Sequence, residues 1–294
     1  MRFKLFHLRK ESFGQPVFVF ASVATFALFN LTSCKETETL DLSGGVDTTS
    51  TVQQKNALLE ELTGVRCVNC PEAHELAKQI AADNPGRVEL VSIHTGFFAV
   101  PYSFSVHNFK IPAGPEIESY LGGPLSYPLA SVDRFLMDGQ TDLLLDKAFW
   151  SGLASQRIAD SLKVELNLST AYNAATRKLD ITLSADYLFD VNDAQKITVL
   201  ITESGIVDAQ LTPEGEDTFY VHDNVLRAVL TASTGDAISE TTAAGTTLQR
   251  TYSYTLPSGT TGLVPENCRV IAFISKETAD SKEVLQVVGK DVVE

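Results

Sequence analysis

The chain has 294 residues, with 23 basic against 37 acidic side chains and a formal charge of −14. Phosphate binding needs clustered Lys and Arg, so this balance argues against a DNA- or RNA-binding protein. Apolar residues make up 44% of the chain and charged residues 20%, which excludes wholesale disorder and a fibrous repeat. The length predicts two domains, each large enough to bury its own core.

The first 33 residues are predicted to be a signal peptide. Basic residues precede an apolar run from Val17 to Leu31, about 15 residues long, whereas a bilayer-spanning helix needs about 20. The run ends in Leu31-Thr32-Ser33-Cys34, which resembles the lipobox of bacterial lipoproteins. The resemblance implies a lipid on Cys34; a free cysteine after a simple signal peptide is the alternative. Loss of residues 1–33, a net +3, would take the charge from −14 to about −17.

Residues 34–55 are polar and rich in Gly, Ser and Thr, which predicts a lipidated, flexible tether. No second apolar run approaches 18 residues, so we expect the mature chain to be held at the outer membrane by its lipid alone. Lys35-Glu36-Thr37-Glu38 resembles the surface-export signal of Bacteroidetes lipoproteins, and a solvated charged linker fits these residues equally well. We therefore expect the protein on the periplasmic face or at the cell surface.

Residues 56–162 begin with a strand-helix-strand pattern. Residues 56–63 and 87–95 are predicted strands, and apolar residues at spacings of three and four from Ala73 to Ala81 predict the helix between them. Cys67-Val68-Asn69-Cys70 stands at the start of that helix. A cysteine in a first helical turn faces unpaired N–H groups and the positive end of the helix dipole, which lowers its pKa. Cys67 is therefore the expected nucleophile, with Arg66 adding positive charge, and Cys70 is placed to resolve a mixed disulfide.

Two other interpretations of the cysteines stay open. His74 shares their helical face, and with His94 on the neighbouring strand it would complete a Cys2His2 metal site. A purely structural disulfide is the second alternative, although so short a loop stabilises little by the chain-entropy argument. We predict no cofactor and no metal, because the sequence has no Gly-rich phosphate loop, no Ser nucleophile elbow and no HExxH motif.

Tyr127-Pro128 precedes a short predicted strand, and a helix is predicted over 143–162. Together with the CxxC pattern, this segment resembles the thioredoxin superfamily. The resemblance implies that Pro128 is a cis-proline whose neighbouring backbone pairs with the substrate peptide. It also implies that Glu61, six residues before Cys67, is a buried acid that moves protons for the resolving thiol. Because Glu60 is adjacent, strand alternation is expected to point only one of the two inward.

The segment also departs from thioredoxin. Arg66 stands where a Trp is expected, and Val68-Asn69 replaces Gly-Pro. About 30 residues rich in aromatics, Pro and Gly separate the second strand from Pro128, with a helix expected near 116–121. This insertion is either a lid or substrate platform over the disulfide or a plain cover of the sheet. Asp133-Arg134 is interpreted as a buried, structural ion pair at the end of the strand.

Residues 163–294 change to short runs rich in Thr, Val, Ile and Tyr. About seven strands separated by turn signals predict an immunoglobulin-like sandwich. The predicted strands cover residues 163–171, 178–187, 196–204, 225–233, 250–256, 269–276 and 284–293. Residues 208–224 and 235–247 are expected to be exposed loops for partner contact, and Cys268 is expected to be a free buried cysteine.

The whole layout resembles a family of Bacteroidetes lipoproteins, the twenty-eight-kilodalton outer-membrane protein family. The residues that bear the resemblance are 59–64, Cys67-Val68-Asn69-Cys70-Pro71, Tyr127-Pro128 and Val132-Asp133-Arg134. It implies an α/β thioredoxin-like domain (56–162), an all-β immunoglobulin-like sandwich domain (163–294) and an envelope location. Two functions fit: a thiol–disulfide oxidoreductase or isomerase acting on thiols or disulfides of envelope proteins, or a surface receptor or adhesin that uses the thioredoxin fold as a scaffold.

Overall fold

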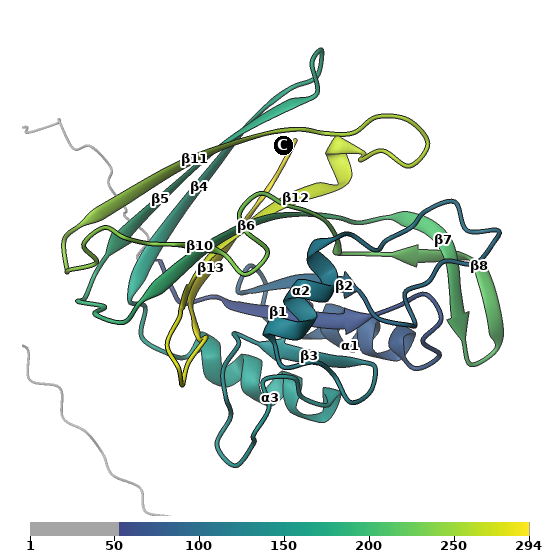
Figure 1. Ribbon diagram of the computed structural model, residues 1–294, viewed down its shortest axis with the longest axis horizontal. Coiled ribbons are helices and arrows are strands. Elements are labelled where there is room, and N and C mark those ends of the chain that lie inside the picture. The colour runs from purple at the N-terminus through teal and green to yellow at the C-terminus, as the bar shows by residue number, and fades with distance from the viewer. Residues whose placement is uncertain (1–52, 294) are drawn as a thin grey trace, which may run out of the picture. The chain divides into compact units, whose positions relative to one another are not determined.

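A computed structural model describes residues 53–293 of the chain. These residues belong to one compact unit, Thr51–Glu294, built mostly of strands in mixed sheets (Figure 1). The expected signal peptide, the lipidation site Cys34 and most of the expected tether lie outside the described residues. Among the described helices, none has the length and apolar character needed to cross a membrane.

The first half alternates strands and helices. Its elements are β1 (Ala57–Thr63), α1 (Cys70–Asp83), β2 (Val88–His94), α2 (Ala113–Tyr120), β3 (Leu129–Val132) and α3 (Lys147–Ile158). β1 pairs with β2 in parallel and with β3 in antiparallel orientation. The strands and helices predicted for this half are present. The helix predicted over 143–162 begins later, because Leu145 pairs with Ala130 in an extended bridge and Asp146 caps the helix.

The second half consists of strands. They are β4 (Val164–Asn173), β5 (Lys178–Tyr187), β6 (Gln195–Glu203), β7 (Ile206–Thr212), β8 (Gly215–His222), β9 (Val225–Val229), β10 (Asp236–Ala237), β11 (Thr247–Thr255), β12 (Cys268–Lys276) and β13 (Val284–Asp291). A strand lies at each of the seven predicted places. The prediction of an exposed loop at 208–224 is wrong, because β7 and β8 form an antiparallel hairpin there.

One sheet of eight strands crosses the domain boundary expected at residue 163. Its order is β13-β12-β6-β9-β2-β1-β3, with β10 paired to β6. β9 is the connection: it is antiparallel to β6 and meets β2 in parallel at Ser92 and Val225. Leu226 of β9 also belongs to the apolar core that Leu58 and Leu62 of β1 build. The two halves therefore share a sheet and a core, so the structure does not separate them into two units.

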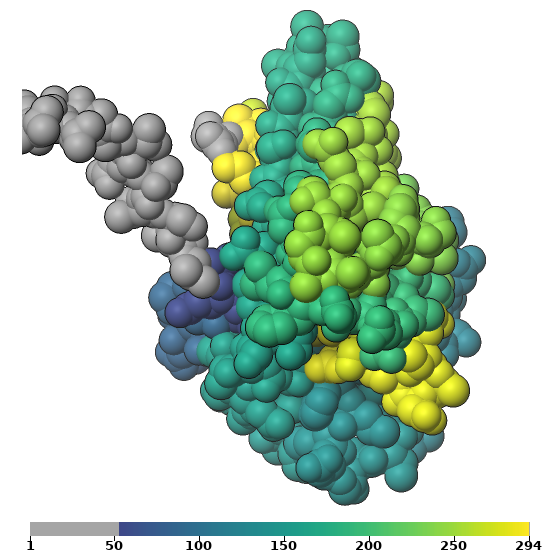
Figure 2. Space-filling model, turned by 90° about the vertical axis from the view of Figure 1, so that its left-hand side faces the viewer, coloured from purple at the N-terminus to yellow at the C-terminus, as the bar shows by residue number. Residues whose placement is uncertain are grey.

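Three large apolar cores hold the layers together, and a fourth, small one gathers Val65, Phe109, Ile206 and Val225. The first lies between the three-stranded sheet β11-β5-β4 and one face of β6 and β12. Figure 2 looks from the side of this sheet, where the teal strands β4 and β5 lie in front. A second core packs α2 against the opposite face of the large sheet, and a third packs α1 and α3 against β1, β2 and β3. β1 and β6 are consequently buried on both faces, as central strands of covered sheets are.

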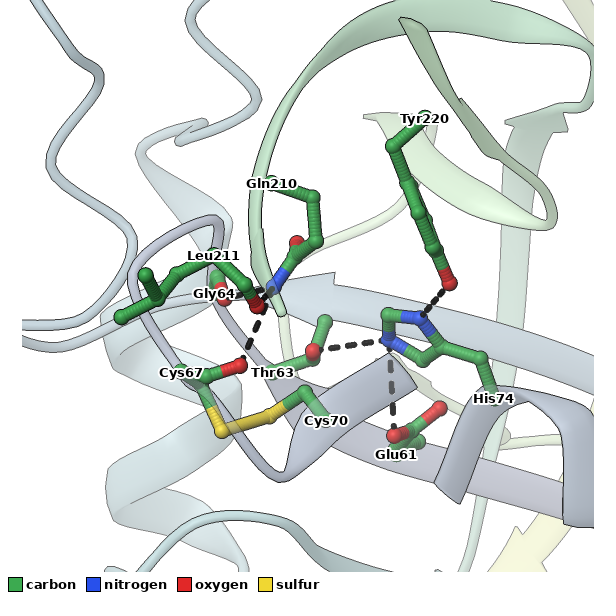
Figure 3. Close-up of a disulfide and its surroundings, with 9 residues drawn as sticks. All are labelled: Glu61, Thr63, Gly64, Cys67, Cys70, His74, Gln210, Leu211 and Tyr220. Atoms are coloured by element: carbon green, nitrogen blue, oxygen red, sulfur yellow. Dashed lines mark hydrogen bonds and ion pairs between the residues drawn. A yellow bond between two sulfur atoms is a disulfide. The ribbon is translucent and has the colours of Figure 1, made fainter. Parts of the chain in front are cut away.

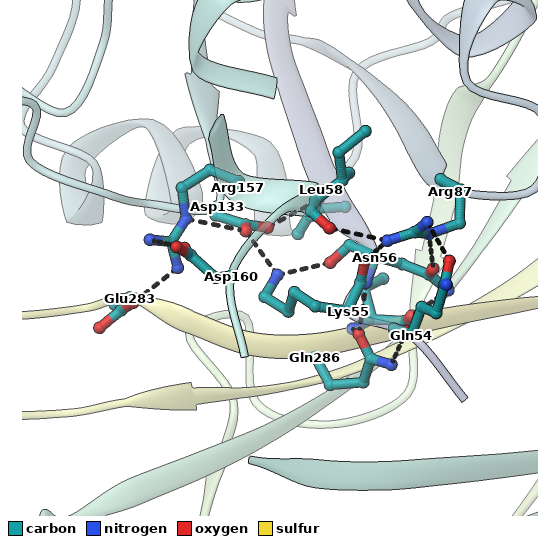
Figure 4. A network of polar contacts seen from close by, with 12 residues as sticks. Gln54, Lys55, Asn56, Leu58, Arg87, Asp133, Arg157, Asp160, Glu283 and Gln286 are labelled. Atoms are coloured by element: carbon teal, nitrogen blue, oxygen red, sulfur yellow. Dashed lines mark hydrogen bonds and ion pairs between the residues drawn. The ribbon is translucent and has the colours of Figure 1, made fainter. Parts of the chain in front are cut away.

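A buried ionic network joins the N-terminal end of the described chain to the sheet (Figure 4). Nζ of Lys55, which is 3% exposed, lies 2.5 Å from Oδ2 of the fully buried Asp133. Arg157 of α3 donates to the same carboxylate at 3.2 Å and to Glu283 at 2.5 Å. The tether expected to reach residue 55 therefore ends earlier, because Lys55 is already part of the folded body.

Candidate active site

The cysteines lie where the chain turns from β1 into α1. Cys67 and Cys70 form a disulfide with Cα atoms 5.4 Å apart. The helix begins at Cys70, so Cys67 lies in the turn before α1 and not in its first helical turn as expected. Pro71 follows at a position where a helix needs no N–H donor. Cys67 is 3% exposed and Cys70 is fully buried (Figure 3), whereas Val68 between them is exposed.

The insertion between β2 and Pro128 packs directly on this turn. The backbone N–H of Arg66 donates to the Phe98 carbonyl at 2.8 Å. A Cβ at Gly64 would stand 2.4 Å from the carbonyl carbon of Phe98, so only glycine allows this approach. The Arg66 guanidinium donates to the carbonyls of Val100 and Pro101. Arg66, expected to add charge beside Cys67, is thus engaged in fixing the insertion next to the disulfide.

Pro128 stands at the start of β3. Its peptide bond with Tyr127 is cis, as the thioredoxin resemblance implies. The Tyr127 ring meets the Phe98 ring edge to face, with centroids 5.6 Å apart. Phe98 therefore links the cis-proline segment to the turn that contains Cys67.

Both neighbouring glutamates are buried, each 1% exposed, although only one was expected to point inward. They lie on opposite faces of β1, and both faces are covered. Glu60 receives two hydrogen bonds of 2.7 Å from Arg134. Glu61 faces α1, and its Oε1 has no hydrogen-bond partner among the described residues. Burial raises the pKa of the Glu61 carboxyl well above its ordinary value, so this group stays protonated where a free glutamate ionises.

His74 of α1 lies beside Glu61 (Figure 3). Its Nε2 is 2.9 Å from Thr63 Oγ1 and 3.6 Å from Glu61 Oε1, and its Nδ1 is 2.8 Å from the Tyr220 hydroxyl. Burial is the main reason that the pKa of His74 falls to about 3, so the imidazole is neutral at physiological pH.

The other histidines of the described chain gather around the same end of the sheet. His94 is 2% exposed, and neither of its ring nitrogens has a hydrogen-bond partner within residues 53–293. Its ring lies 5.6 Å from that of His222, whose pKa burial lowers to about 4. His107 pairs with Asp208 at 3.0 Å. No group of three or more His, Cys, Asp or Glu side chains within residues 53–293 is arranged to hold a metal ion.

The β7–β8 hairpin, which the sequence interpretation missed, is fastened to the cysteine turn. Nε2 of Gln210 donates to the carbonyls of Cys67 at 3.0 Å and Gly64 at 3.4 Å. The backbone N–H of Leu211 donates to the Val65 carbonyl at 2.7 Å. At the end of β8 Val221 is exposed and His222 is buried, the alternation of a strand covered on one face, whereas residues 215–219 are all exposed. That alternation was the available signal, and it spans too few residues to be distinctive.

Exposed apolar side chains are found on the segments around the disulfide. Val68 lies in the cysteine turn, Phe97 and Phe98 lie in the insertion, and Leu125 precedes the cis peptide bond. Leu125 is 99% exposed and Phe97 is 78% exposed. Exposed apolar groups of this kind mark surfaces that contact other polypeptides or ligands.

Comparison with known proteins assigns this chain to a protein family. A family model described as outer membrane protein Omp28 matches residues 123–294, which is more than half of the chain and includes Pro128 but neither Cys67 nor Cys70. No curated protein matches the sequence. HBP35 of Porphyromonas gingivalis has a similar structure, with a TM-score of 0.64 and 17% identity over 81% of this chain and 76% of that one.

A structural-genomics protein of Agrobacterium tumefaciens is also similar, with a TM-score of 0.50 and 12% identity over 82% of this chain and 96% of that one. Identities this low show a shared fold and nothing further. The family model is the stronger finding because it matches the sequence itself over more than half of the chain, including the whole of the second half. On that match, this chain belongs to the Omp28 outer membrane protein family.

Proposed function

We propose that this protein is an envelope thiol–disulfide oxidoreductase or isomerase whose first half is a thioredoxin-like domain. The observation on which the proposal rests is the Cys67–Cys70 disulfide at the start of α1, with the buried carboxyl of Glu61 near it, whose Oε1 has no hydrogen-bond partner among the described residues. The parallel β1-α1-β2 unit and the cis-proline before β3 are the further parts that the thioredoxin resemblance implies. Perturbed, unpaired acids are typical of functional sites.

In this proposal each site residue has a distinct role. Cys67 is the nucleophile, since it lies closer to the exposed turn and at the positive end of α1, where a thiolate is stabilised. Cys70 resolves the mixed disulfide, and Glu61 exchanges a proton with Cys70. Backbone next to Pro128 pairs with the substrate. Thiols or disulfides of envelope proteins are the substrates, and an oxidising compartment favours oxidation or isomerisation.

The proposal also covers the rest of the chain. A lipid on Cys34 holds the protein at the outer membrane, on its periplasmic face or at the cell surface; the lipobox-like residues before Cys34 and the outer-membrane family support this. We describe the second half as an immunoglobulin-like sandwich. The apolar core between β11-β5-β4 and the strands β6 and β12 supports that description.

A second candidate is a surface receptor or adhesin that uses the thioredoxin-like half as a scaffold. Burial of both cysteines favours it, because exchange requires a thiolate that a partner thiol or disulfide can reach. The hydrogen bonds from Gln210 to the cysteine turn favour it as well, since they hold that turn closed.

The pH dependence of Cys67 alkylation separates the two candidates. The full-length protein in detergent is reduced, exposed to iodoacetamide from pH 5 to 9, and analysed by mass spectrometry of the peptide that contains Cys67. The redox proposal predicts a midpoint below about 7.5, with Cys70 labelled more slowly. A Cys70→Ser variant is the matched control, because its Cys67 has no disulfide partner. A midpoint near about 8.5, or no labelling of the native protein, would favour the receptor.

A further inference from the structure

A small cavity lies between β1, α1, β2 and the β7–β8 hairpin. Its volume of about 10 Å³ accommodates one water molecule. Glu61, His74, Ser92 and Tyr220 are among the residues that line it. Glu61 Oε1, which is fully buried and without a hydrogen-bond partner among the described residues, is positioned to accept a hydrogen bond from a water molecule there.

The contacts of His74 extend from this carboxyl toward the surface. One ring nitrogen lies near Thr63 and Glu61, and the other lies 2.8 Å from the hydroxyl of Tyr220, which is partly exposed (Figure 3). A neutral imidazole has one N–H donor and one acceptor nitrogen. It therefore passes a proton by accepting one at the first nitrogen and releasing one from the second. The Tyr220 hydroxyl both donates and accepts, so it passes the proton on without ionising.

We propose that His74 and Tyr220 form the path by which Glu61 exchanges protons with solvent during thiol–disulfide exchange. This inference rests on the proposed redox function and names two positioning residues for it. Tyr220 belongs to the β7–β8 hairpin and lies 146 residues after His74 in the sequence. The hairpin thus supplies a part of the site that a thioredoxin-like first half does not contain by itself.

The reaction in which this path acts begins with the disulfide present in the structure. A thiolate of an incoming dithiol attacks Cys67 Sγ, a new S–S bond forms, and the Cys67–Cys70 bond breaks. Cys70 leaves as a thiolate and takes the proton of Glu61. The second thiol of the dithiol loses its proton to solvent and attacks the mixed disulfide, which releases Cys67 as a thiolate. The dithiol is oxidised by two electrons and the protein disulfide is reduced by two. Glu61, left ionised, regains a proton from solvent through Tyr220 and His74.

Other titratable and charged groups surround His74. Glu75 and Lys78 lie on α1, His94 on β2, His222 on β8, and Asp223 follows β8. Lys78 is paired with Glu75 at 2.6 Å and with Asp223 at 3.3 Å, and neither acid has a hydrogen bond to His74. Among these groups, Tyr220 is hydrogen-bonded to one ring nitrogen of His74, and Glu61 Oε1 lies 3.6 Å from the other.

The test measures reduction of the Cys67–Cys70 disulfide by dithiothreitol in the full-length protein. Samples are quenched with acid and alkylated, and the rate is followed from pH 6 to 9 for wild type, His74→Gln and Tyr220→Phe. The path predicts a rate loss of about a hundredfold for His74→Gln, the lower end of what positioned proton transfer contributes, and a smaller loss for Tyr220→Phe. Both losses should grow as pH rises. Tyr254→Phe, on β11 of the three-stranded sheet, is the matched control and should match wild type.

A second measurement separates proton transfer from a merely structural role. A lost path slows reduction and reoxidation equally, so the midpoint potential of the disulfide in a glutathione buffer should not change in Tyr220→Phe. Variants that react at the wild-type rate with the wild-type pH profile overturn the inference while the redox function stands. A shifted midpoint potential with an unchanged pH profile overturns it too, in favour of a structural role. A wild-type disulfide that dithiothreitol cannot reduce in the native protein refutes the redox function and the path together.

Discussion

Two adjacent glutamates in β1 are equally buried and have opposite surroundings. Glu60 faces α2 and receives two hydrogen bonds from Arg134, whose guanidinium also lies over the Phe273 ring at 4.7 Å. Glu61 faces α1 among Thr63, His74 and a cavity for one water, with no charged partner. A few ångströms of backbone therefore separate a carboxylate with both oxygens hydrogen-bonded to a guanidinium from a cluster of uncharged titratable groups.

The comparison indicates what each cluster is for. Buried charges that are paired and hydrogen-bonded serve the fold, because removing one partner leaves the other desolvated and alone. Buried titratable groups kept neutral and unpaired reduce stability, and such groups are typical of functional sites. By this reasoning the Glu60 face joins the sheet to its neighbours, and the Glu61 face is the one to which we assign the proposed chemistry.

The largest expected effect is on the paired side. Arg134→Met leaves the Glu60 carboxylate buried without its partner and should lower the free energy of unfolding by about 3–5 kcal/mol. Denaturant unfolding of the purified protein measures it. The double variant Glu60→Gln/Arg134→Met should regain most of the loss. Glu61→Gln, one residue along, exchanges a protonated carboxyl for an amide of the same shape and, measured near pH 4 where the unfolded glutamate is still mostly protonated, should change stability by less than about 1 kcal/mol. Equal losses for Arg134→Met and Glu61→Gln would remove the distinction between the two faces.

A second prediction concerns pH. Burial lowers the pKa of His74 to about 3 and of His222 to about 4, and lowers that of His94 well below its ordinary value. The unfolded chain therefore binds protons near pH 6.5 that the folded chain does not, so stability falls as pH falls. Each of these histidines should account for about 2 kcal/mol of stability lost between pH 8 and pH 5.

Glu61 acts in the opposite direction. Its raised pKa means that the unfolded chain releases a proton above about pH 4.5 that the folded chain keeps, so its contribution to stability falls as pH rises. Unfolding free energies at pH 5, 6, 7 and 8 measure both effects. His94→Asn should reduce the stability lost between pH 8 and pH 5 by the contribution of one histidine. Glu61→Gln should make the free energy of unfolding rise more steeply with pH. Profiles parallel to wild type in both variants would mean that these groups titrate normally in the fold.

A third, smaller effect is expected at the hairpin. Gln210→Met removes the hydrogen bonds to the carbonyls of Cys67 and Gly64 while keeping the side-chain length, and should lower the free energy of unfolding by about 1 kcal/mol. Faster reduction of the disulfide by dithiothreitol is expected as well, because the cysteine turn is then held less firmly. The exposed Gln249 of β11 gives the matched control, Gln249→Met. If both variants behave alike, the hairpin does not restrain the turn.

The smallest effect is expected for an ion pair on the surface. Lys147 and Glu72 lie 2.5 Å apart, but their side chains are 31% and 76% exposed. Lys147→Ala should change stability by less than about 0.5 kcal/mol, and less still in high salt. A loss as large as that of Arg134→Met would contradict the view that burial, and not charge pairing as such, gives the Glu60 cluster its importance.

Local patterns predicted much of the fold. Apolar residues at spacings of three and four located α1, and short runs rich in β-branched residues located seven strands of the second half. The burial of both Glu60 and Glu61 was not predictable from β1, because alternation assumes one covered face and the second cover comes from α2 far along the chain. The shared sheet was also missed because it depends on residues far apart in the sequence: β9 meets β2 through a single pairing of Ser92 with Val225.

The candidate site was predictable in part. The spacing of Cys67 and Cys70 and the place of Pro128 follow from the sequence and its resemblance. Gln210 and Tyr220 do not, since their partners lie more than 140 positions away and the acidic residues at 214–217 favour a loop. The surroundings of His74 were not predicted either, because the helical face that it shares with the cysteines suggested a metal ligand, whereas the structure turns it toward Thr63 and Tyr220.

The protonation state of Glu61 tests the central claim most directly. Protein labelled with ¹³C at glutamate carboxyls is titrated from pH 4 to 9 by infrared or NMR spectroscopy, and the Glu61 signal is assigned by its loss in Glu61→Gln. Because burial raises the pKa of Glu61, the Glu61 carboxyl of the oxidised protein should still hold its proton at a pH where a free glutamate is ionised. A Glu61 signal that is already ionised at pH 5 would contradict the account, because the group behind the disulfide would then have no proton to give.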